Sequence, residues 1–267
     1  MKATKHFFTH AYIALVLFFL YAPAVVILVQ SFNASRYRGT WDGFTTEWYV
    51  SLFEDEGILE AFRNSMVIGL LSAVIATVIA LLASLALIHM RKRTRSVLTG
   101  IANIPLLNAD IVTGISFMLL FLSFGLRFGF GSVLIAHITF NIPYAMLCIL
   151  PRLNSFNHSY YEAAIDLGAS PLQAFFRVVL PDLRPGLLAG LLLAFTMSLD
   201  DFIITHFTRG SGFDTLPTKI YAELKLGIHP EMYALFTLFF GAILLLLLLL
   251  RLNKRTRQTL QDALRNV

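Results

Sequence analysis

The sequence predicts an all-α membrane protein with six transmembrane helices. Of its 267 residues, 57% are hydrophobic and 14% are charged, and the mean hydropathy is +0.72. This is the composition of a polytopic membrane protein. Several apolar segments approach the ~20 residues that a helix needs to cross a bilayer. Basic residues gather in alternate connecting segments, as they do in helical membrane proteins.

The predicted spans follow one another along the whole chain, as a single transmembrane domain over residues 1–267. They lie at about residues 11–30, 65–89, 98–124, 130–150, 186–207 and 233–250. The first span follows Lys2 and Lys5, as the apolar part of a signal peptide would. Its apolar stretch is too long for a signal peptide and no convincing cleavage site follows, so we expect it to be retained. Pro105 can bend the third span.

The distribution of lysine and arginine predicts the orientation in the membrane. One set of segments carries 14 basic residues, namely the N-terminus, 90–97, 151–185 and the C-terminal tail. The other set carries seven, in residues 31–64, 125–129 and 208–232. Both termini and segment 151–185 are therefore expected in the cytoplasm. The pI near 9.4 then reflects topology, and nucleic acid is not an expected partner; the basic tail is expected to touch membrane lipid.

An external amphipathic stretch is predicted at residues 44–62. Trp48, Tyr49, Leu52 and Phe53 are expected to lie at the membrane interface. We favour this anchoring role over a role in binding a ligand.

The cytoplasmic segment 151–185 reads as two short helices joined by a turn. Ser159 and Glu162 have the spacing of a capping box, and Gly168 supplies a left-handed stop. Two carboxylates, Glu162 and Asp166, lie one turn apart on this first helix. The helix pair can pack on its own bundle. Because caps and a turn define both of its helices, we favour docking to another protein.

The second helix begins at a second capping box, formed by Ser170 and Gln173, with Pro171 at its first position. It carries an apolar stripe that Pro181 is expected to terminate. The stripe consists of Leu172, Phe175, Phe176, Val179 and Leu180.

Several kinds of chemistry have no residues to support them. The single cysteine, Cys148, lies in an apolar run, so no disulfide framework or thiolate metal cluster is expected. The sequence has no phosphate-binding loop of the Gly-x-x-x-x-Gly-Lys-Ser/Thr type. His137 and His206 lack metal-ligand spacing and are expected to be neutral, hydrogen-bonded core residues. We therefore predict no catalytic residue, no metal site and no cofactor bound by this chain. Polar contacts between helices are expected from Asn108, Asn141 and Ser198.

Three acidic residues, Asp110, Asp200 and Asp201, lie inside the predicted spans, and no lysine or arginine lies there to pair with them. Ionisable residues inside a membrane usually face a cavity or a partner. From the predicted cytoplasmic ends, Asp110 lies about 18 Å deep and Asp200 about 20 Å, which suits one path for a cation. Asp200 and Asp201 point ~100° apart on a helix, so we expect one to line the path and the other to bond a neighbouring helix or subunit. The alternative is that all three satisfy internal polar contacts.

The cytoplasmic segment also carries a long motif with fixed spacing. In order, the residues are Glu162, Ala163, Ala164, Gly168, Val178, Leu180 and Pro181. The motif resembles the coupling signature of bacterial ABC importer permeases, in which isoleucine is usual at position 178. The resemblance implies a type I importer transmembrane domain. It also implies that the short helix around Glu162–Leu167 inserts into a groove on a separate ATPase, which would hold ATP and Mg²⁺.

Further motifs narrow the resemblance to the C-type permeases of spermidine/putrescine importers. They are Ser31–Asn33, Gly43–Thr46 ahead of Trp48, Ser198–Phe202, Thr215–Pro217, Ile220–Tyr221 and Gly227–Glu231. The resemblance implies a bacterial inner membrane location and a heterodimer with a similar permease. The other partners it implies are an ATPase dimer and a periplasmic polyamine-binding protein.

Three other functions compete with this interpretation. A permease of the same fold could carry an amino-acid derivative, an opine, a phosphonate or a ferric ion, although unpaired carboxylates disfavour an anion. A self-sufficient carrier or channel would show internal pseudo-symmetry, which the sequence lacks. An intramembrane enzyme would need a nucleophile–base or metal pair in the spans, and none is present at suitable spacing.

Overall fold

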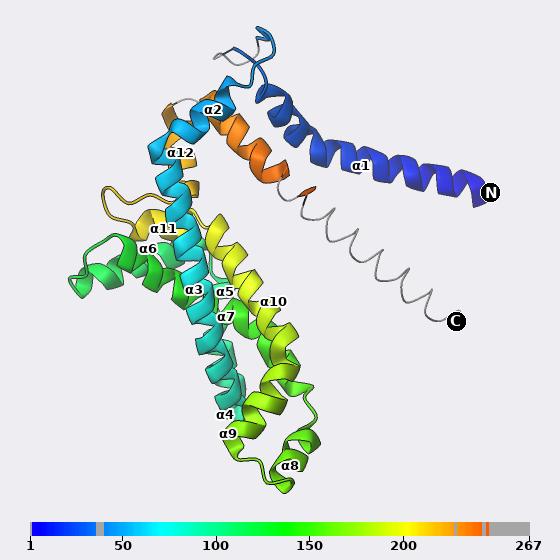
Figure 1. Ribbon diagram of the computed structural model, residues 1–267, viewed down its shortest axis with the longest axis vertical. Helices are drawn as coiled ribbons and strands as arrows, with labels where there is room; N and C mark the ends of the chain where they lie inside the picture. Colours follow the sequence, from blue (N-terminus) through cyan, green and yellow to red (C-terminus); the bar gives the residue numbers. More distant parts are fainter. Residues whose placement is uncertain (1, 36–39, 227–228, 242–243, 246–267) are drawn as a thin grey trace. The chain divides into compact units, whose positions relative to one another are not determined.

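The computed structural model describes the chain except residues 1, 36–39, 227–228, 242–243 and 246–267 (Figure 1). The described residues are predominantly helical, and their β structure is confined to an isolated antiparallel bridge between Asn33 and Phe44. The long helices confirm the predicted all-α membrane class. Those long and apolar enough to cross a membrane are Tyr12–Gln30, Glu56–Ile88, Phe130–Asn154 and Pro171–Asp200, with a shorter apolar helix at Asp110–Ser123.

The chain divides into two compact units, of which the first contains Met1–Glu56 and Ala222–Val267. In this unit α1 (Lys2–Gln30) leads through a turn to α2 (Glu47–Glu54). The turn is closed by the buried Asn33, whose carbonyl accepts from the Trp48 indole Nε1 at 2.7 Å. Trp48 and Leu52 are buried, so the predicted interfacial role is wrong for them, whereas Phe53 is exposed. Residues 230–241 are helical, and much of the predicted span 233–250 lies outside the described residues.

The second unit, Gly57–Tyr221, is built around α3 (Glu56–Ile88), α7 (Phe130–Asn154) and α10 (Leu180–Asp200). These long helices run side by side in Figure 1. Glycine allows α7 and α10 to touch backbone to backbone: a Cβ at Gly190 would lie 3.1 Å from the Ala145 carbonyl oxygen. A Cβ at Gly186 would lie 3.1 Å from the Cys148 carbonyl oxygen.

The predicted third span, 98–124, is not one helix. It consists of α4 (Lys92–Ala102), α5 (Ile104–Leu107) and α6 (Asp110–Ser123). Pro105 has no N–H to donate to the preceding turn, and Asn108 and Ala109 are extended, with ψ of 151° and 137°. The prediction of a continuous helix was wrong because a proline-induced bend is followed by a complete break.

The predicted fifth span, 186–207, begins earlier than expected and is also broken. A continuous helical run extends over Pro171–Asp200, formed by α9 (Pro171–Ala174), a π-helical turn η1 (Phe175–Val179) and α10. Pro181 therefore does not end the second helix, and that prediction was wrong. In the π turn the Leu180 N–H reaches back to the Phe175 carbonyl, immediately before the proline that cannot donate. Beyond Asp201, α11 (Ile203–Thr208) follows.

Candidate functional site

The first helix of the pair predicted in segment 151–185 is α8 (His158–Asp166), and its cap differs from the predicted one. Asn157 is the N-cap, and its Oδ1 accepts from the Ser159 N–H at 3.0 Å. The predicted capping box of Ser159 and Glu162 was therefore wrong, because the asparagine two residues earlier satisfies the first helical amides. Gly168 ends the helix at φ +87°, which confirms its predicted left-handed conformation.

The second helix begins as predicted. The Ser170 Oγ accepts from the Gln173 N–H at 3.3 Å, and the Gln173 Oε1 accepts from the Ser170 N–H at 3.0 Å. Both bonds of the capping box are thus present, with Pro171 at the first helical position. The α8–α9 turn is therefore fixed by residues local to it.

The predicted apolar stripe divides into an inner and an outer part. Phe175 and Val179 pack inward against a cluster that contains Leu153 and Leu183. Leu172 and Phe176 point outward instead, with exposed fractions of 70% and 60%. Together with Tyr160 and Leu167 they form what we call the apolar tip: Tyr160, Leu167, Leu172 and Phe176, which are 62%, 89%, 70% and 60% exposed.

The motif residues surround the apolar tip. Glu162, Ala163, Asp166 and Gly168 are exposed, whereas Ala164, Leu180 and Pro181 are half-buried. Exposed alanine and glycine leave room for a close approach, and large apolar side chains beside them provide area to bury. This arrangement suits insertion of α8 into a groove of another protein.

A contact between Arg152 and Asp182, which the sequence analysis did not identify, joins the end of α7 to the start of α10 next to the helix pair. Arg152, in the last turn of α7, donates Nη2 to the Asp182 Oδ1 at 2.9 Å and Nε to the Asp182 carbonyl at 3.0 Å. A two-point arginine contact fixes direction as well as distance. Sequence gave no signal for it, since the pair is formed by residues on two different helices.

The three predicted path carboxylates all lie at helix breaks. Asp110 is the first residue of α6 and is exposed; Asp200 is the last residue of α10 and is also exposed. The two breaks are neighbours because α11 packs against α6. A Cβ at Gly114 would lie 2.9 Å from the Phe207 ring and 3.4 Å from the Ile203 carbonyl oxygen. The exposed carboxylates thus belong to two broken helices that pack together.

Asp201 has different surroundings from Asp200. Its side chain is 8% exposed, and it accepts hydrogen bonds from the Ile204 N–H at 3.1 Å and the Thr205 N–H at 2.7 Å. The Thr205 hydroxyl donates to the same carboxylate at 2.8 Å. Asp201 therefore caps α11 and holds the break, while Asp200 is left exposed.

A line of buried hydrogen bonds extends from Asp201 into the helix bundle. His137, 1% exposed, contacts the Thr205 hydroxyl at 2.9 Å through Nε2 and the Ser198 hydroxyl at 2.5 Å through Nδ1. Ser198 accepts from Ser72 at 3.2 Å, and Ser72 accepts from the Asn141 amide at 3.3 Å. We call this set the buried polar chain: Asn141, Ser72, Ser198, His137, Thr205 and Asp201. It joins α3, α7, α10 and α11.

The donors and acceptors of the buried polar chain select one histidine tautomer. The Thr205 hydroxyl donates to Asp201, so it accepts from His137, which places the proton on Nε2. Nδ1 then accepts from the Ser198 hydroxyl, which itself accepts from Ser72. From Asn141 to Thr205 the donors are directed toward Asp201, with the Gly69 carbonyl as a second acceptor for the Ser72 hydroxyl at 3.2 Å. Successive hydrogen bonds of this kind strengthen one another in a low-dielectric interior.

The predictions for the individual polar residues have mixed outcomes. His137 is a hydrogen-bonded core residue and Asn141 and Ser198 bridge helices, as predicted. A carboxylate lies beside His137 because the break returns Asp201 to α7. His206 is exposed and its prediction as a core residue was wrong. Asn108 is also exposed, and lies at a cavity.

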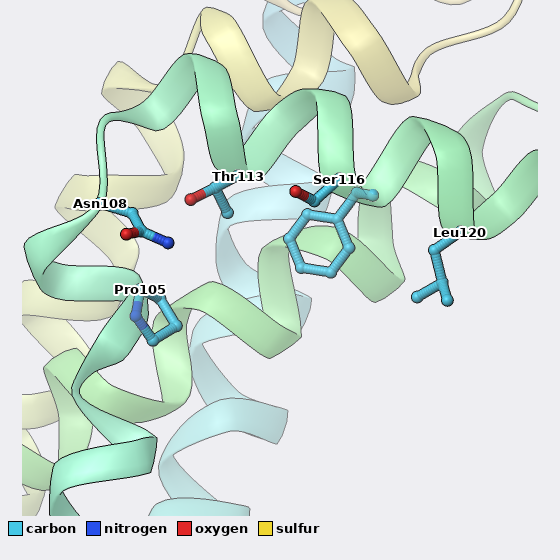
Figure 2. A pocket seen from close by; sticks show the side chains of 6 residues that line it. Pro105, Asn108, Thr113, Ser116 and Leu120 are labelled. Carbon is cyan, nitrogen blue, oxygen red and sulfur yellow. The ribbon is translucent and has the colours of Figure 1, made fainter.

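That cavity lies at the bend between α5 and α6, next to Asp110 in the chain. It has a volume of about 280 Å³, and its lining residues are Pro105, Asn108, Thr113, Ser116, Phe117 and Leu120. In Figure 2 the Asn108 amide and the Thr113 hydroxyl lie on the same side of the bend. The amide and hydroxyl oxygens in this lining offer acceptors for an amine group, and Asp110 follows in the chain without being part of the lining.

The chain is similar to known transport proteins over most of its length. A family described as "Binding-protein-dependent transport system inner membrane component" matches residues 76–258. The spermidine/putrescine transport system permease protein PotC of Escherichia coli (strain K12) is 38% identical over 220 residues, 82% of this chain and 83% of that protein. PotC of Haemophilus influenzae is 36% identical and covers 94% of this chain and 98% of its own length. The putrescine transport system permease protein PotI of E. coli (strain K12) is 36% identical over 84% and 83% of the two chains.

Solved structures of bacterial ABC transporters share the fold. A transporter involved in the import of the acidic polysaccharide alginate matches with a TM-score of 0.67 over 96% of both chains, at 18% identity. An amino acid ABC transporter matches with a TM-score of 0.54 over 76% of this chain and 98% of its own, at 17% identity. With an exposed helix pair, a bundle broken at buried and exposed carboxylates, and relatives above 30% identity, the chain belongs to the family of inner membrane components of binding-protein-dependent transport systems.

Proposed function

We propose that this permease subunit imports polyamines, with spermidine and putrescine as the principal substrates, across the bacterial inner membrane by alternating access. The similarity to PotC and PotI supports the substrate class. One observation of the site supports the proposal most directly: Asp110 and Asp200 are exposed at two adjoining helix breaks. Predicted spans 98–124 and 186–207 contain no lysine or arginine, so these carboxylates are available to a cation.

The chain acts with three kinds of partner in this proposal. A similar, non-identical permease completes the path, a periplasmic polyamine-binding protein delivers the solute, and two ATPase subunits supply the energy. The apolar tip and the exposed motif residues Glu162, Ala163 and Asp166 dock on one ATPase from the cytoplasm, where both termini also lie. Closure of the ATPase dimer around ATP draws the two docking loops together and opens the path outward; hydrolysis returns it inward.

The proposal assigns different roles to the neighbouring carboxylates. Asp200 contacts the cationic solute, and Asp201 holds the α10–α11 break through Thr205 and His137. Asp110 contributes a second carboxylate from the first residue of α6, next to the α5–α6 bend that borders the cavity. A solute with two or more ammonium groups suits two separated carboxylates.

The test is ATP-dependent uptake of labelled spermidine and putrescine in cells that carry the whole transporter. Asp200→Asn and Asp110→Asn should each reduce uptake about 10-fold or more, if each removes ~1.4 kcal/mol of favourable interaction with the cation. Asp42→Asn, which removes an exposed carboxylate in the other unit, should leave uptake unchanged. Normal uptake in cells lacking this chain would refute the substrate assignment, and normal uptake in both path variants would refute the carboxylate path.

A second candidate is import of another small solute through the same fold. The structural neighbour that handles an acidic polysaccharide has the same architecture, so fold alone does not choose the solute. A competition experiment distinguishes polyamine import from import of another solute. Excess unlabelled spermidine should abolish uptake of labelled putrescine, whereas an excess of an opine or a phosphonate should not. Strong competition by an anionic solute would favour the second candidate.

A further inference from the structure

Helix α4 carries two surfaces that the transport proposal does not use. One is a polar stripe of Lys92, Arg95, Ser96 and Thr99, which have the i, i+3, i+4, i+7 spacing of one helical face. The other is an apolar face on which Val97, Leu98 and Ile101 have exposed fractions of 61%, 38% and 56%. A helix with basic residues on one face and exposed apolar residues on the other is typical of the membrane interface.

The polar stripe borders a cavity between α4 and the C-terminal part of α7. Its volume is about 410 Å³, and its lining residues are Lys92, Arg95, Ser96, Thr99, Gly100 and Leu150. The lining thus combines two cations, two hydroxyls and a glycine around which a Cβ would meet nothing within 4 Å. Cations and hydroxyl donors around an open space are suited to a phosphate group.

Arg95 is oriented toward this cavity by a second helix. Its Nη2 donates to the Asn154 Oδ1 at the end of α7 at 2.6 Å. A guanidinium has further N–H donors in a fixed plane, so this bond orients the group and leaves donors for an anion. Asn154 is neutral, so the positive charge of Arg95 is not cancelled by this contact.

The local charge also favours an anion. Residues 61–109 contain no aspartate or glutamate, whereas residues 91–95 contain four basic residues. Lys92 is also the first residue of α4, where the helix dipole adds positive potential. The membrane surface presents phosphate groups at the same level as an interfacial helix, with acyl chains directly beneath them.

We propose that the α4–α7 cavity binds the phosphate headgroup of an anionic phospholipid. Lys92 and Arg95 contact the phosphate, and Ser96 and Thr99 donate hydrogen bonds to it. The acyl chains leave the cavity past Leu150 of its lining and past the exposed Leu98, which lies about 60° from Arg95 around α4. Leu150 and Leu98 beside the cations select a lipid over a free phosphate ion, since a free ion would bury no apolar area there.

Binding can be measured by calorimetric titration of the purified full-length chain in dodecyl maltoside. The probes are dioctanoyl phosphatidylglycerol, dioctanoyl phosphatidylcholine and glycerol phosphate. We expect the anionic lipid to bind at least about 10-fold more tightly than either of the others, since it alone combines a net charge with acyl chains. Equal affinity for phosphatidylcholine would overturn the charge argument, and equal affinity for glycerol phosphate would overturn the lipid argument.

Paired variants localise the binding to the cavity. Lys92→Gln combined with Arg95→Gln should weaken phosphatidylglycerol binding about 30-fold. Arg91→Gln combined with Arg93→Gln removes the same charge from residues that do not line the cavity, and should weaken it less than about threefold. Equal losses in the two double variants would overturn the site in favour of a diffuse charge effect.

Two further experiments separate a loss of lipid binding from misfolding of the variant and from a role of this surface in ATPase binding. Arg95→Lys retains the cation and should keep most of the affinity, whereas a loss equal to that of Arg95→Gln would show that the charge is not what binds. The Lys92→Gln, Arg95→Gln variant should still associate with the ATPase. Lost ATPase association with unchanged lipid binding would assign the surface to the ATPase and overturn the proposal.

Discussion

The His137 Nε2 lies 3.4 Å from the Asp201 Oδ2, so a histidine in the middle of α7 reaches the break between α10 and α11. Thr205 lies between them in the hydrogen-bond pattern, because it accepts from His137 and donates to Asp201. The contact explains why two adjacent aspartates have different surroundings: one is held inside the bundle, and the other is left exposed.

Asp201→Ala should destabilise the protein more than Asp200→Ala. The first change leaves the Ile204 and Thr205 amides and the Thr205 hydroxyl without their acceptor, at a cost of about 1–3 kcal/mol. The second removes an exposed side chain and should change stability by less than about 0.5 kcal/mol. Thermal unfolding of the purified chain in detergent measures both. Equal destabilisation would contradict the capping role of Asp201.

Replacement of Leu167 should weaken binding of the ATPase. Leu167 is 89% exposed at the centre of the turn after α8, and Leu167→Ser removes apolar area worth about 1.5–3 kcal/mol when buried in an interface, or about 10-fold or more in affinity. Phe124→Ser, at an exposed position far along the second unit from the pair, is the matched control. Pull-down of the ATPase from solubilised membranes provides the measurement; equal retention by both variants would remove the apolar tip from the interface.

Glycine substitutions should distinguish the packed helix interface from the open one. Gly190→Leu forces side-chain atoms against the Ala145 backbone, and overpacking of this kind costs about 1–3 kcal/mol. Gly100 is also helical but a Cβ there meets nothing within 4 Å, so Gly100→Ala should be neutral or stabilising by up to about 1 kcal/mol. Circular dichroism during heating measures the thermal stability of the two variants. A Gly190 variant as stable as the Gly100 variant would refute the close approach of α7 and α10.

Asn157 should matter more to α8 than Ser159. Asn157→Ala removes the side chain that caps the helix, which typically costs about 1 kcal/mol, whereas Ser159→Ala leaves the cap intact. Hydrogen exchange of the α8 amides reports the difference, with exchange about fivefold faster in the Asn157 variant. Faster exchange in the Ser159 variant instead would restore the original capping box.

Local patterns in the sequence predicted the helices, because a helix depends on neighbours a few residues apart. The Ser170 capping box, the left-handed Gly168 and the burial of His137 were all predicted from such signals. The α8 cap was assigned wrongly because Asn157 and Ser159 are both good caps and only the geometry chooses between them.

The breaks in the helices were harder to predict from the sequence. Long apolar runs flank the few polar residues at both breaks, and hydrophobicity alone does not report whether the backbone remains helical. Pro105 indicated a bend, but the complete break at Asn108 and Ala109 needed the geometry of the bundle. The buried polar chain depends on side chains from four helices, and no sequence spacing brings Ser72, His137 and Thr205 together.

The continuous helical run from Pro171 to Asp200 has a mechanical consequence. Its 30 residues correspond to a helical rod about 45 Å long, which begins beside the apolar tip, contains η1 and Pro185, and ends at the exposed Asp200 carboxylate. The π turn beside Pro181 keeps the rod unbroken where a proline would otherwise weaken it. Helices kink at π turns and at prolines, so a displacement of the α8–α9 turn is passed to the Asp200 carboxylate along one helical run whose bending points are η1 and Pro185.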